Sequence, residues 1–252
     1  RARRGKRRRG QSPRELAVVS PGRVTDAALP DLDDKPRVVE EMFDRIAPRY
    51  DTLNRVLTFR MDVAWRRTAS KMLGLRPDSR VLDLACGTGD LCRTLTAAGH
   101  APVGLDFSAG MLRAAHTDAP LVRADAMQLP FAAATFDALT CGFALRNFAA
   151  LAPVLAECSR VLRPGGRIAL LDVAEPESPL VRSVHGAWFR HVVPFVGGLI
   201  SDRAAYRYLP ASTAYLPPLP ELLALVGDAG IVDVSRRTLG FGAAQLITGT
   251  RV

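Results

Sequence analysis

Cysteine and histidine are scarce in this sequence of 252 residues, which holds four of each. Its cysteines, Cys86, Cys92, Cys141 and Cys158, form no Cys-x-x-Cys pair, and no His–Cys cluster accompanies them. Structural zinc sites and disulfide frameworks both need such grouping. We therefore expect no bound metal and four reduced, mostly buried thiols, as is typical of a cytoplasmic protein.

Long hydrophobic runs are also missing. The longest apolar run near a predicted helix, residues 192–200, is interrupted by Pro194 and two glycines, whereas a membrane-spanning helix needs about 20 apolar residues. No apolar segment follows the basic residues at the N-terminus, so they lack the pattern of a secretory signal. The composition, 48% hydrophobic and 23% charged, is that of an ordinary globular chain.

Outside its first residues the chain has almost no net charge. Residues 1–14 contain eight basic side chains and no acidic one, and the remainder holds 26 basic against 25 acidic residues. A near-neutral body gives no general electrostatic case for a nucleic-acid surface. We predict that residues 1–34 form a disordered basic tail and linker ahead of one domain, 35–252. The tail has three interpretations: contact with anionic lipid, loose nucleic-acid binding, or no role.

The most informative stretch is Arg80–Asp90, with the sequence RVLDLACGTGD. Its first half is apolar except for Asp83, which predicts a strand buried on both faces. Gly87 and Gly89 then allow a tight turn that a ligand can approach closely, and a helix starting at Asp90 would add unpaired N–H groups. The pattern predicts a nucleotide-type pocket; the alternative is a turn that only caps a core helix.

The acidic residues indicate which ligand fits. A dinucleotide fingerprint requires a third glycine where position 92 is cysteine, and Asp90 would repel a pyrophosphate. An amino group and a sulfonium would instead be attracted by Asp83 and Asp90, which favours S-adenosylmethionine. Two further predicted strands end at carboxylates, Asp106 for the ribose hydroxyls and Asp125 for the adenine edge.

Strand and helix signals alternate after residue 80. We predict strands near 80–85, 101–106, 120–124, 136–141 and 167–173, helices after the first two and at 149–162, then a helix at 219–229 and two final strands. Such alternation gives right-handed crossovers and a mostly parallel sheet covered on both faces. The predicted fold class is α/β: a Rossmann-like, seven-stranded class I S-adenosylmethionine-dependent methyltransferase.

Segments outside this core are expected to complete the site. Helices at 36–46 and 62–73, separated by a turn at 50–54, should lie over the ligand pocket, and residues 163–166 should form a tight turn into the fifth strand. Residues 179–215 are rich in aromatic side chains. We interpret them as a helical insertion on the substrate side that covers an apolar substrate; the alternative is a helical pair that only completes the core.

Four motifs resemble those of the ubiquinone/menaquinone biosynthesis C-methyltransferase family. They are residues 43–54 (FDRIAPRYDTLN) continuing to Trp65, 142–147 (GFALRN), 160–166 (RVLRPGG) and 206–212 (YRYLPAS). The similarity covers about residues 35–251. The Pro-Gly-Gly turn is common among methyltransferases, whereas the Tyr-Asp…Asn…Trp and Phe-x-Leu-Arg-Asn motifs are much more specific.

The resemblance implies methyl transfer from S-adenosylmethionine, without a metal, to a ring carbon of a reduced, prenylated benzoquinol or naphthoquinol. The high Arg, Ala and Pro content is typical of a GC-rich bacterial genome and favours demethylmenaquinol as the acceptor. Thr88, Asp106, Asp125 and Ala126 match cofactor positions of the family, and Met111 and Met127 would pack on the adenine unless they are core residues. The residues expected to bind the cofactor are Asp83, Gly87, Thr88, Gly89, Asp106, Met111, Asp125, Ala126 and Gly142.

The sequence departs from the family pattern at four places. Asp62 stands where a His is common, Gly142 where a Ser could bond to the cofactor, and Asp172 where a Glu is usual. Near the C-terminus, Gly240–Gly242 and Gln245 replace a Gly-Gly…His pattern. The last departure bears on the choice of substrate more than on the reaction.

The reaction needs alignment and an electron-rich ring carbon rather than a metal. Arg146 is the candidate to stabilise the quinol oxyanion, or to orient a water that takes its proton, and Asn147 would orient that water or the second oxygen. Tyr50 would close over the sulfonium. Other interpretations are a salt bridge of Arg146 with an acid such as Glu157, a helix-capping role for Asp51, and proton acceptance or simple packing for His185 and His191.

Three other functions stay open. One is a methyltransferase of the same fold that acts on a soluble phenolic or polyketide metabolite, and another is a non-catalytic S-adenosylmethionine-binding protein. A nucleic-acid methyltransferase is disfavoured, because residues 141–145 (CGFAL) lack an Asn/Asp-Pro-Pro-aromatic motif. A prenylated substrate predicts a cytoplasmic protein in transient, peripheral contact with the inner face of the membrane. A homodimer is an option that the sequence does not decide.

Overall fold

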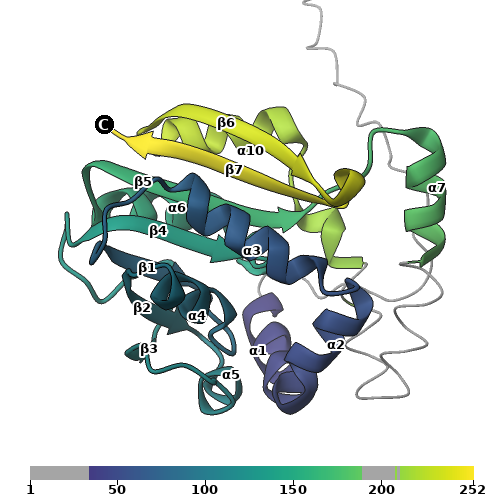
Figure 1. Ribbon diagram of the computed structural model, residues 1–252, viewed down its shortest axis with the longest axis horizontal. Helices are drawn as coiled ribbons and strands as arrows, with labels where there is room; N and C mark the ends of the chain where they lie inside the picture. The colour runs from purple at the N-terminus through teal and green to yellow at the C-terminus, as the bar shows by residue number, and fades with distance from the viewer. Residues whose placement is uncertain (1–33, 189–207, 209–210) are drawn as a thin grey trace, which may run out of the picture.

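The computed structural model describes residues 34–188, 208 and 211–252, and in them one seven-stranded sheet dominates (Figure 1). The strand order is β3-β2-β1-β4-β5-β7-β6. Neighbours pair in parallel from β3 to β5, and β7 is antiparallel to both β5 and β6. The strands are β1 (Arg80–Leu84), β2 (Ala101–Asp106), β3 (Leu121–Arg123), β4 (Phe136–Gly142), β5 (Leu162–Val173), β6 (Ile231–Leu239) and β7 (Ala244–Arg251).

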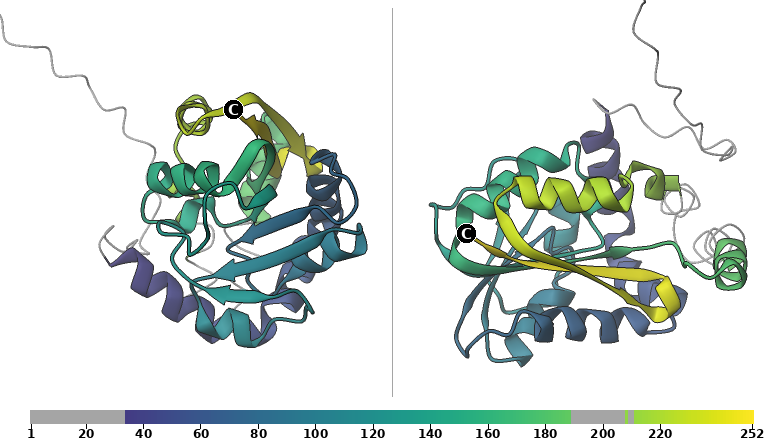
Figure 2. Two further views of the ribbon diagram at one scale, coloured as in Figure 1. Left: turned by 90° about the vertical axis from the view of Figure 1, so that its left-hand side faces the viewer. Right: turned by 90° about the horizontal axis from the view of Figure 1, so that it is seen from above.

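Helices cover both faces of the sheet (Figure 2). On one face α6 and α10 pack their apolar sides on the strands, and on the other α3 and α4 do so. A third cluster joins α1 and α2 to α5 and Tyr208. The helices are α1 (Lys35–Ile46), α2 (Tyr50–Leu57), α3 (Met61–Met72), α4 (Asp90–Ala97), α5 (Ala109–Arg113), α6 (Leu151–Val161), α7 (Pro179–Ala187) and α10 (Leu219–Asp228), and the 3₁₀ segments are η1 (Ala47–Arg49), η2 (Leu145–Asn147), η4 (Ser212–Tyr215) and η5 (Gly240–Gly242).

The order of the strands confirms the predicted fold class and fixes where a ligand can bind. The chain builds β1, β2 and β3 toward one edge and then returns to place β4 on the other side of β1. In open parallel sheets, the crevice at the carboxyl ends of strands on either side of such a switch point is the usual ligand site. The glycine-rich turn after β1 lies at this crevice.

Two local predictions were wrong. Residues 50–54 were expected to form a turn but begin helix α2, because Leu53 is fully buried in the cluster of α1, α2 and α5, and this packing overrides the turn-forming Asp51 and Asn54. The fifth strand begins at Leu162 rather than at residue 167. The expected turn at 163–166 is a bulge within it: the β4–β5 register passes from Phe136↔Leu162 to Ala138↔Arg167.

Several predictions lie outside the described residues. These are the disordered state of the N-terminal tail, residues 189–207 and 209–210 of the insertion, and the position of His191. The side chain of His185 on α7 is likewise outside the description. The insertion contributes α7, Tyr208 and η4 to the described structure. Among the described helices, none is both long enough and apolar enough to span a bilayer.

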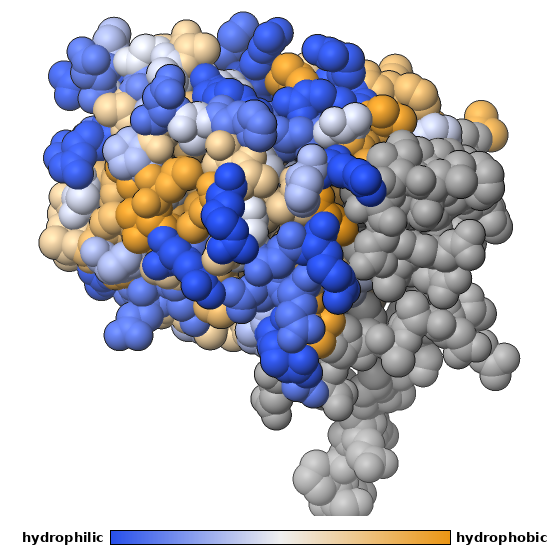
Figure 3. All heavy atoms as spheres, turned by 90° about the horizontal axis from the view of Figure 1, so that it is seen from below, coloured by the Kyte–Doolittle hydropathy of each residue, from blue (hydrophilic) through white to orange (hydrophobic). Residues whose placement is uncertain are grey.

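On the face that carries α1, α2 and α5, hydrophobic side chains are interspersed with hydrophilic ones (Figure 3).

Asp83 in β1 is buried among the strands, where its carboxylate accepts hydrogen bonds from Thr140 Oγ1 at 2.8 Å and Cys92 Sγ at 3.4 Å. Burial raises the pKa of Asp83 to about 7. The folded protein therefore binds this proton more tightly than the unfolded chain does. The resulting stability is complete below the unfolded pKa of about 3.9 and is lost as the pH rises to about 7.

Asp83→Asn should remove this pH dependence. We expect the free energy of unfolding of the wild type, relative to that of the variant, to fall by on the order of 2 kcal/mol between about pH 5 and pH 8. Urea unfolding at the two pH values measures it, with Asp228→Asn on the exposed end of α10 as the control. A pH-independent difference would contradict the proposed protonation of Asp83.

Candidate functional site

The carboxyl ends of β1 to β4 surround a cavity with an open volume of about 900 Å³, which we call the strand-end cavity. Helix α1 covers it, as the sequence predicted, whereas the other N-terminal helix expected there, α3, lines the second cavity described below. Its lining includes eight of the predicted site residues, Tyr50, Gly87, Asp106, Met111, Asp125, Ala126, Gly142 and Asn147, together with Met127. The structure thus brings together most of the residues expected at the cofactor.

Asp106, at the end of β2, ties the glycine-rich turn to the sheet. Its Oδ2 accepts a hydrogen bond from Gly87 N at 2.7 Å, and its Oδ1 accepts one from Ser108 N at 2.9 Å. Gly87 has φ +55°, a value that favours glycine. Burial raises the pKa of Asp106, which the backbone hydrogen bonds oppose. A carboxylate held in this way keeps free lone pairs to accept hydrogen bonds from ligand hydroxyls.

The opposite wall of the strand-end cavity is apolar with a polar edge. Met111 is buried at the start of α5, and Met127 is 37% exposed beyond β3. Asp125, two residues after the end of β3, accepts a hydrogen bond from Met127 N at 2.9 Å. Flat apolar walls beside a carboxylate suit a planar heterocycle with an exocyclic amino group. A Cβ at Gly142 would lie 2.9 Å from Leu91 Cδ1, so a larger residue there would require the Leu91 side chain to move.

Three predicted cofactor residues do not line this cavity but support the turn that does. Asp83 lies in the core, as described above. The Thr88 hydroxyl donates a short hydrogen bond to Asp51. Gly89 caps α4 with φ +83°, and a Cβ there would lie 2.7 Å from Thr117 Cγ2. Asp83 thus connects β1 to β4 and α4, Thr88 connects the glycine-rich turn to α2, and Gly89 lets α4 begin directly after the turn.

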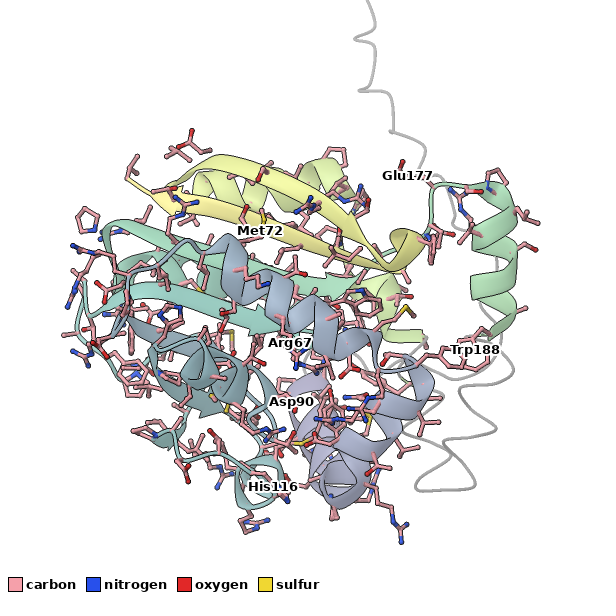
Figure 4. All side chains as sticks on the ribbon, viewed as in Figure 1. Arg67, Met72, Asp90, His116, Glu177 and Trp188 are labelled. Atoms are coloured by element: carbon pink, nitrogen blue, oxygen red, sulfur yellow. The ribbon has the colours of Figure 1, made fainter. Side chains whose placement is uncertain are left out.

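The expectation that Asp90 attracts a cationic ligand is wrong. Asp90 lines neither of the two cavities described here; it faces the N-terminal helices (Figure 4). It pairs with Arg55 Nη2 at 2.8 Å, with Arg66 Nη2 at 3.6 Å, and closely with Arg93. Three guanidinium groups neutralise this carboxylate and tie α2 and α3 to the start of α4. Asp51, considered above as a helix cap, also joins this network through Arg55 and Arg93.

A second, larger cavity of about 1330 Å³ adjoins the first. We call it the apolar cavity, because aliphatic and aromatic side chains from α2, α3, α7, η5 and their connections form most of its wall. Its polar residues are few: Asn54, Thr58, Asp62, Arg66 and Arg146 besides Tyr50. Tyr50 and Phe143 line both cavities. The sequence did not reveal this cavity, although Trp65, which lines it, is the last residue of the first family-like motif.

Tyr50 occupies the junction of the two cavities. Its ring packs edge-to-face on Phe43 with the centroids 5.9 Å apart, and the side chain of Asn54 hydrogen bonds to its hydroxyl. Desolvation raises the pKa of the Tyr50 hydroxyl, while the nearby charges of Arg66 and Arg146 lower it. The raised pKa means that the hydroxyl stays neutral at physiological pH.

Arg146 is buried at 6% exposure and lines the apolar cavity from η2. Its Nη1 donates to Asp172 Oδ1 at 2.5 Å and to Phe143 O at 2.9 Å, and its Nε donates to Ser212 Oγ at 3.0 Å. The salt-bridge interpretation is therefore correct in kind, but its partner is Asp172 and not Glu157. Glu157 pairs with Arg160 instead.

One part of the Arg146 guanidinium stays available. With the described residues, Nη2 forms no hydrogen bond. Asn147, the next residue, lines the strand-end cavity, and its Oδ1 accepts a long hydrogen bond of 3.4 Å from the Tyr208 hydroxyl. Arg146 and Asn147 thus line different cavities, Arg146 the apolar cavity and Asn147 the strand-end cavity. Within the described residues, no group of three or more His, Cys, Asp or Glu side chains could hold a metal ion.

Known proteins share this fold and much of this sequence. A SAM-dependent methyltransferase from Thermotoga maritima has a TM-score of 0.61 at 19% identity, with 84% of this chain and 99% of that chain covered. Phosphoethanolamine N-methyltransferase 2 of Haemonchus contortus, solved with S-adenosyl-L-methionine, has a TM-score of 0.55 at 13% identity, over 74% of this chain and 52% of that chain. At such identities the likeness shows the fold alone.

Closer relatives are found by sequence. The chain is 43% identical over 219 residues to the ubiquinone/menaquinone biosynthesis C-methyltransferase UbiE of Syntrophotalea carbinolica, covering 83% of this chain and 92% of that protein. It is 41% identical over 236 residues to the demethylmenaquinone methyltransferase of a Roseiflexus species, covering 90% and 99%. Residues 31–251 match the pattern of the ubiE/COQ5 methyltransferase family. The chain belongs to the ubiE/COQ5 methyltransferase family.

Proposed function

We propose that this protein transfers the methyl group of S-adenosylmethionine to a ring carbon of a reduced, prenylated quinone. One observation carries the proposal: a strand-end cavity suited to the methyl donor and a larger apolar cavity meet at Tyr50 and Phe143. A transfer in line from sulfur to carbon needs two ligands that meet at one point and are shielded from water. The two sequence relatives described above are also named for steps of quinone biosynthesis.

The strand-end cavity fits the methyl donor. Asp106 would accept hydrogen bonds from the ribose hydroxyls, and Asp125 would meet the adenine amino group, with Met111 and Met127 against its plane. Gly87 and Gly142 provide close backbone approach. S-adenosylmethionine supplies an electrophilic methyl group, so the protein itself has only to bind, orient and exclude water.

Arg146 provides the electrostatics in the apolar cavity. A quinol ring carbon becomes a strong nucleophile when the adjacent hydroxyl loses its proton, and a guanidinium stabilises the resulting oxyanion in a low-dielectric site. Nη2 is the atom we assign to this role. Because arginine stays protonated, the proton must go to a water that Arg146 or Asn147 orients, and not to the guanidinium itself.

Tyr50 would close the junction between the ligands. Its neutral hydroxyl oxygen and its ring face both attract a cation, so it can hold the reacting methyl in line. The guanidinium groups of Arg66 and Arg146 favour ionisation of this hydroxyl, but burial opposes it more strongly and raises its pKa. We therefore assign Tyr50 a positioning and not a proton-accepting role.

Several finer points belong to the proposal. Demethylmenaquinol is the acceptor we favour, because relatives named for this reaction match nearly the whole chain. A prenyl tail longer than the apolar cavity would stay in the bilayer, so we propose a cytoplasmic enzyme in peripheral contact with the inner membrane face. The insertion at 179–215 is the substrate-side cover in this proposal, with α7 and η4 as its described parts.

A soluble phenolic acceptor is the second candidate. The segment in which the sequence departs from the family pattern lines the apolar cavity, through Gly240, Phe241 and Ala243. Different residues in this part of the cavity wall can change which aromatic ring the cavity accepts as methyl acceptor. This candidate keeps the same donor, the same Arg146 and the same chemistry.

Asp106→Asn should weaken binding of S-adenosylmethionine by about tenfold or more, because a hydrogen bond to a charged acceptor contributes about 1.5–3 kcal/mol. Isothermal titration calorimetry measures this, with Asp228→Asn as the matched control. Thermal unfolding of both variants reports any loosening of the turn that Asp106 holds. Unchanged affinity in a folded Asp106→Asn variant would remove Asp106 from the cofactor site.

The function is tested by radiolabelled methyl transfer into reduced demethylmenaquinone, its benzoquinol counterpart and a soluble naphthol. We expect the naphthoquinol to be the best acceptor, and Arg146→Ala to lower kcat by about 10²–10³-fold. Arg146→Lys should recover only part of the rate, since an ammonium group lacks the fork geometry. Affinity for S-adenosylmethionine should stay within about twofold, since Arg146 lines the other cavity.

The assay has two contrary outcomes. Turnover of the naphthol alone would favour the soluble-metabolite function. Cofactor binding without transfer to any quinol extract would favour a non-catalytic binding protein.

A further inference from the structure

Two phenylalanines stand exposed at the mouth of the apolar cavity. Phe59 is 67% and Phe241 88% exposed, and both line the cavity. They come from distant parts of the chain: Phe59 from the turn between α2 and α3, and Phe241 from η5 at the tip of the β6–β7 hairpin. Trp188, at the end of α7 on the side toward α2 (Figure 4), packs on Phe59 with ring centroids 4.9 Å apart.

Both phenylalanines adopt a backbone conformation that is unfavourable for bulky side chains. Their φ values are +51° for Phe59 and +57° for Phe241, in the left-handed region where bulky residues are uncommon. Gly240 must be glycine, because a Cβ would lie 2.4 Å from Trp65 Cζ2. The phenyl group of Phe241 has no comparable packing reason, since nearly all of it faces solvent. Strained, exposed aromatic residues at a cavity mouth indicate a function outside folding.

The exposed charged side chains in the stretch that follows Phe59 are basic. Between residues 55 and 77 the only acidic residue is Asp62, which is buried and paired with Arg66. Arg60, Arg67 and Lys71 are exposed along the same stretch, and Arg67 points outward from α3 (Figure 4). This edge of the molecule therefore combines apolar rings with positive charge and offers no exposed carboxylate within that stretch.

We propose that Phe59 and Phe241 insert into the surface of an anionic lipid bilayer and open the apolar cavity toward it. Aromatic rings are favoured at the membrane interface, and exposed basic residues nearby add attraction to anionic headgroups. The orientation would let the prenyl tail pass directly from the lipid into the cavity, while the ring reaches Arg146 and Tyr50. The inference rests on the proposed function for its purpose, but its test does not depend on turnover.

The test is sedimentation of the full chain with mixed phosphatidylcholine and phosphatidylglycerol vesicles, at low salt and near 1 M salt. Near 1 M salt the Debye length falls to about 3 Å. Electrostatic attraction between the basic N-terminal residues and the anionic headgroups is then largely screened. We expect Phe59→Ser and Phe241→Gly each to lower the high-salt partition coefficient about tenfold, the equivalent of about 1.4 kcal/mol. Val252→Ser, at an exposed apolar residue at the other end of the sheet (Figure 1), should leave it unchanged.

The Phe241→Gly variant also distinguishes a loss of membrane binding from a loss of folding stability. Glycine takes φ +57° without strain, so this variant should unfold at a temperature no lower than the wild type. Partition of both Phe variants equal to that of the wild type would overturn the proposal and place any membrane contact elsewhere. So would wild-type binding that disappears in high salt, or lack of wild-type binding. These outcomes leave the methyl-transfer assay unaffected, because sedimentation requires neither the donor nor the quinol.

Discussion

The buried pair of Arg146 and Asp172 is the interaction on which the site depends. Asp172 is fully buried near the end of β5 and accepts hydrogen bonds from Arg146, from Leu145 N and from Val173 N. It therefore fixes both the guanidinium and the backbone of η2, which separates the two cavities. A buried charge without such a partner would be strongly destabilising. The pairing leaves Nη2 available, so the same contact stabilises the fold and orients the group that we assign to the oxyanion.

The N-terminal helices are attached to the core by a second set of charges. Asp90 at the start of α4 forms salt bridges with arginines from α2, α3 and its own helix. Asp51 on α2 accepts a hydrogen bond from the hydroxyl of Thr88. These contacts hold Tyr50, the first residue of α2, at the junction of the cavities. The acidic residues that seemed to belong to the ligand instead position the wall around it. In the proposed function, Asp106, Asp125 and the apolar residues of the strand-end cavity bind the methyl donor.

The sequence predicted the fold well because long apolar runs and glycine-rich turns are local signals. The seven strands, the covering helices and most of the predicted residues that line the strand-end cavity follow from them. What it could not predict depends on tertiary packing: Leu53 makes a helix of an expected turn, and three arginines surround Asp90. The partner of Arg146 was also missed, because Asp172 reads as one more residue of a buried strand. The apolar cavity needs Phe59 and Phe241 together, and no local pattern connects these two residues.

The central claim is that donor and acceptor meet at Tyr50 and Phe143, with Arg146 at the acceptor's oxygen. A crystal structure with S-adenosylhomocysteine and a short-chain naphthoquinol tests it most directly. The account predicts the sulfur beside Tyr50 in the strand-end cavity, and a quinol oxygen within hydrogen-bond distance of Arg146 Nη2 in the apolar cavity. A ring bound outside the apolar cavity, or an Arg146 that contacts only Asp172 and Ser212, would contradict it.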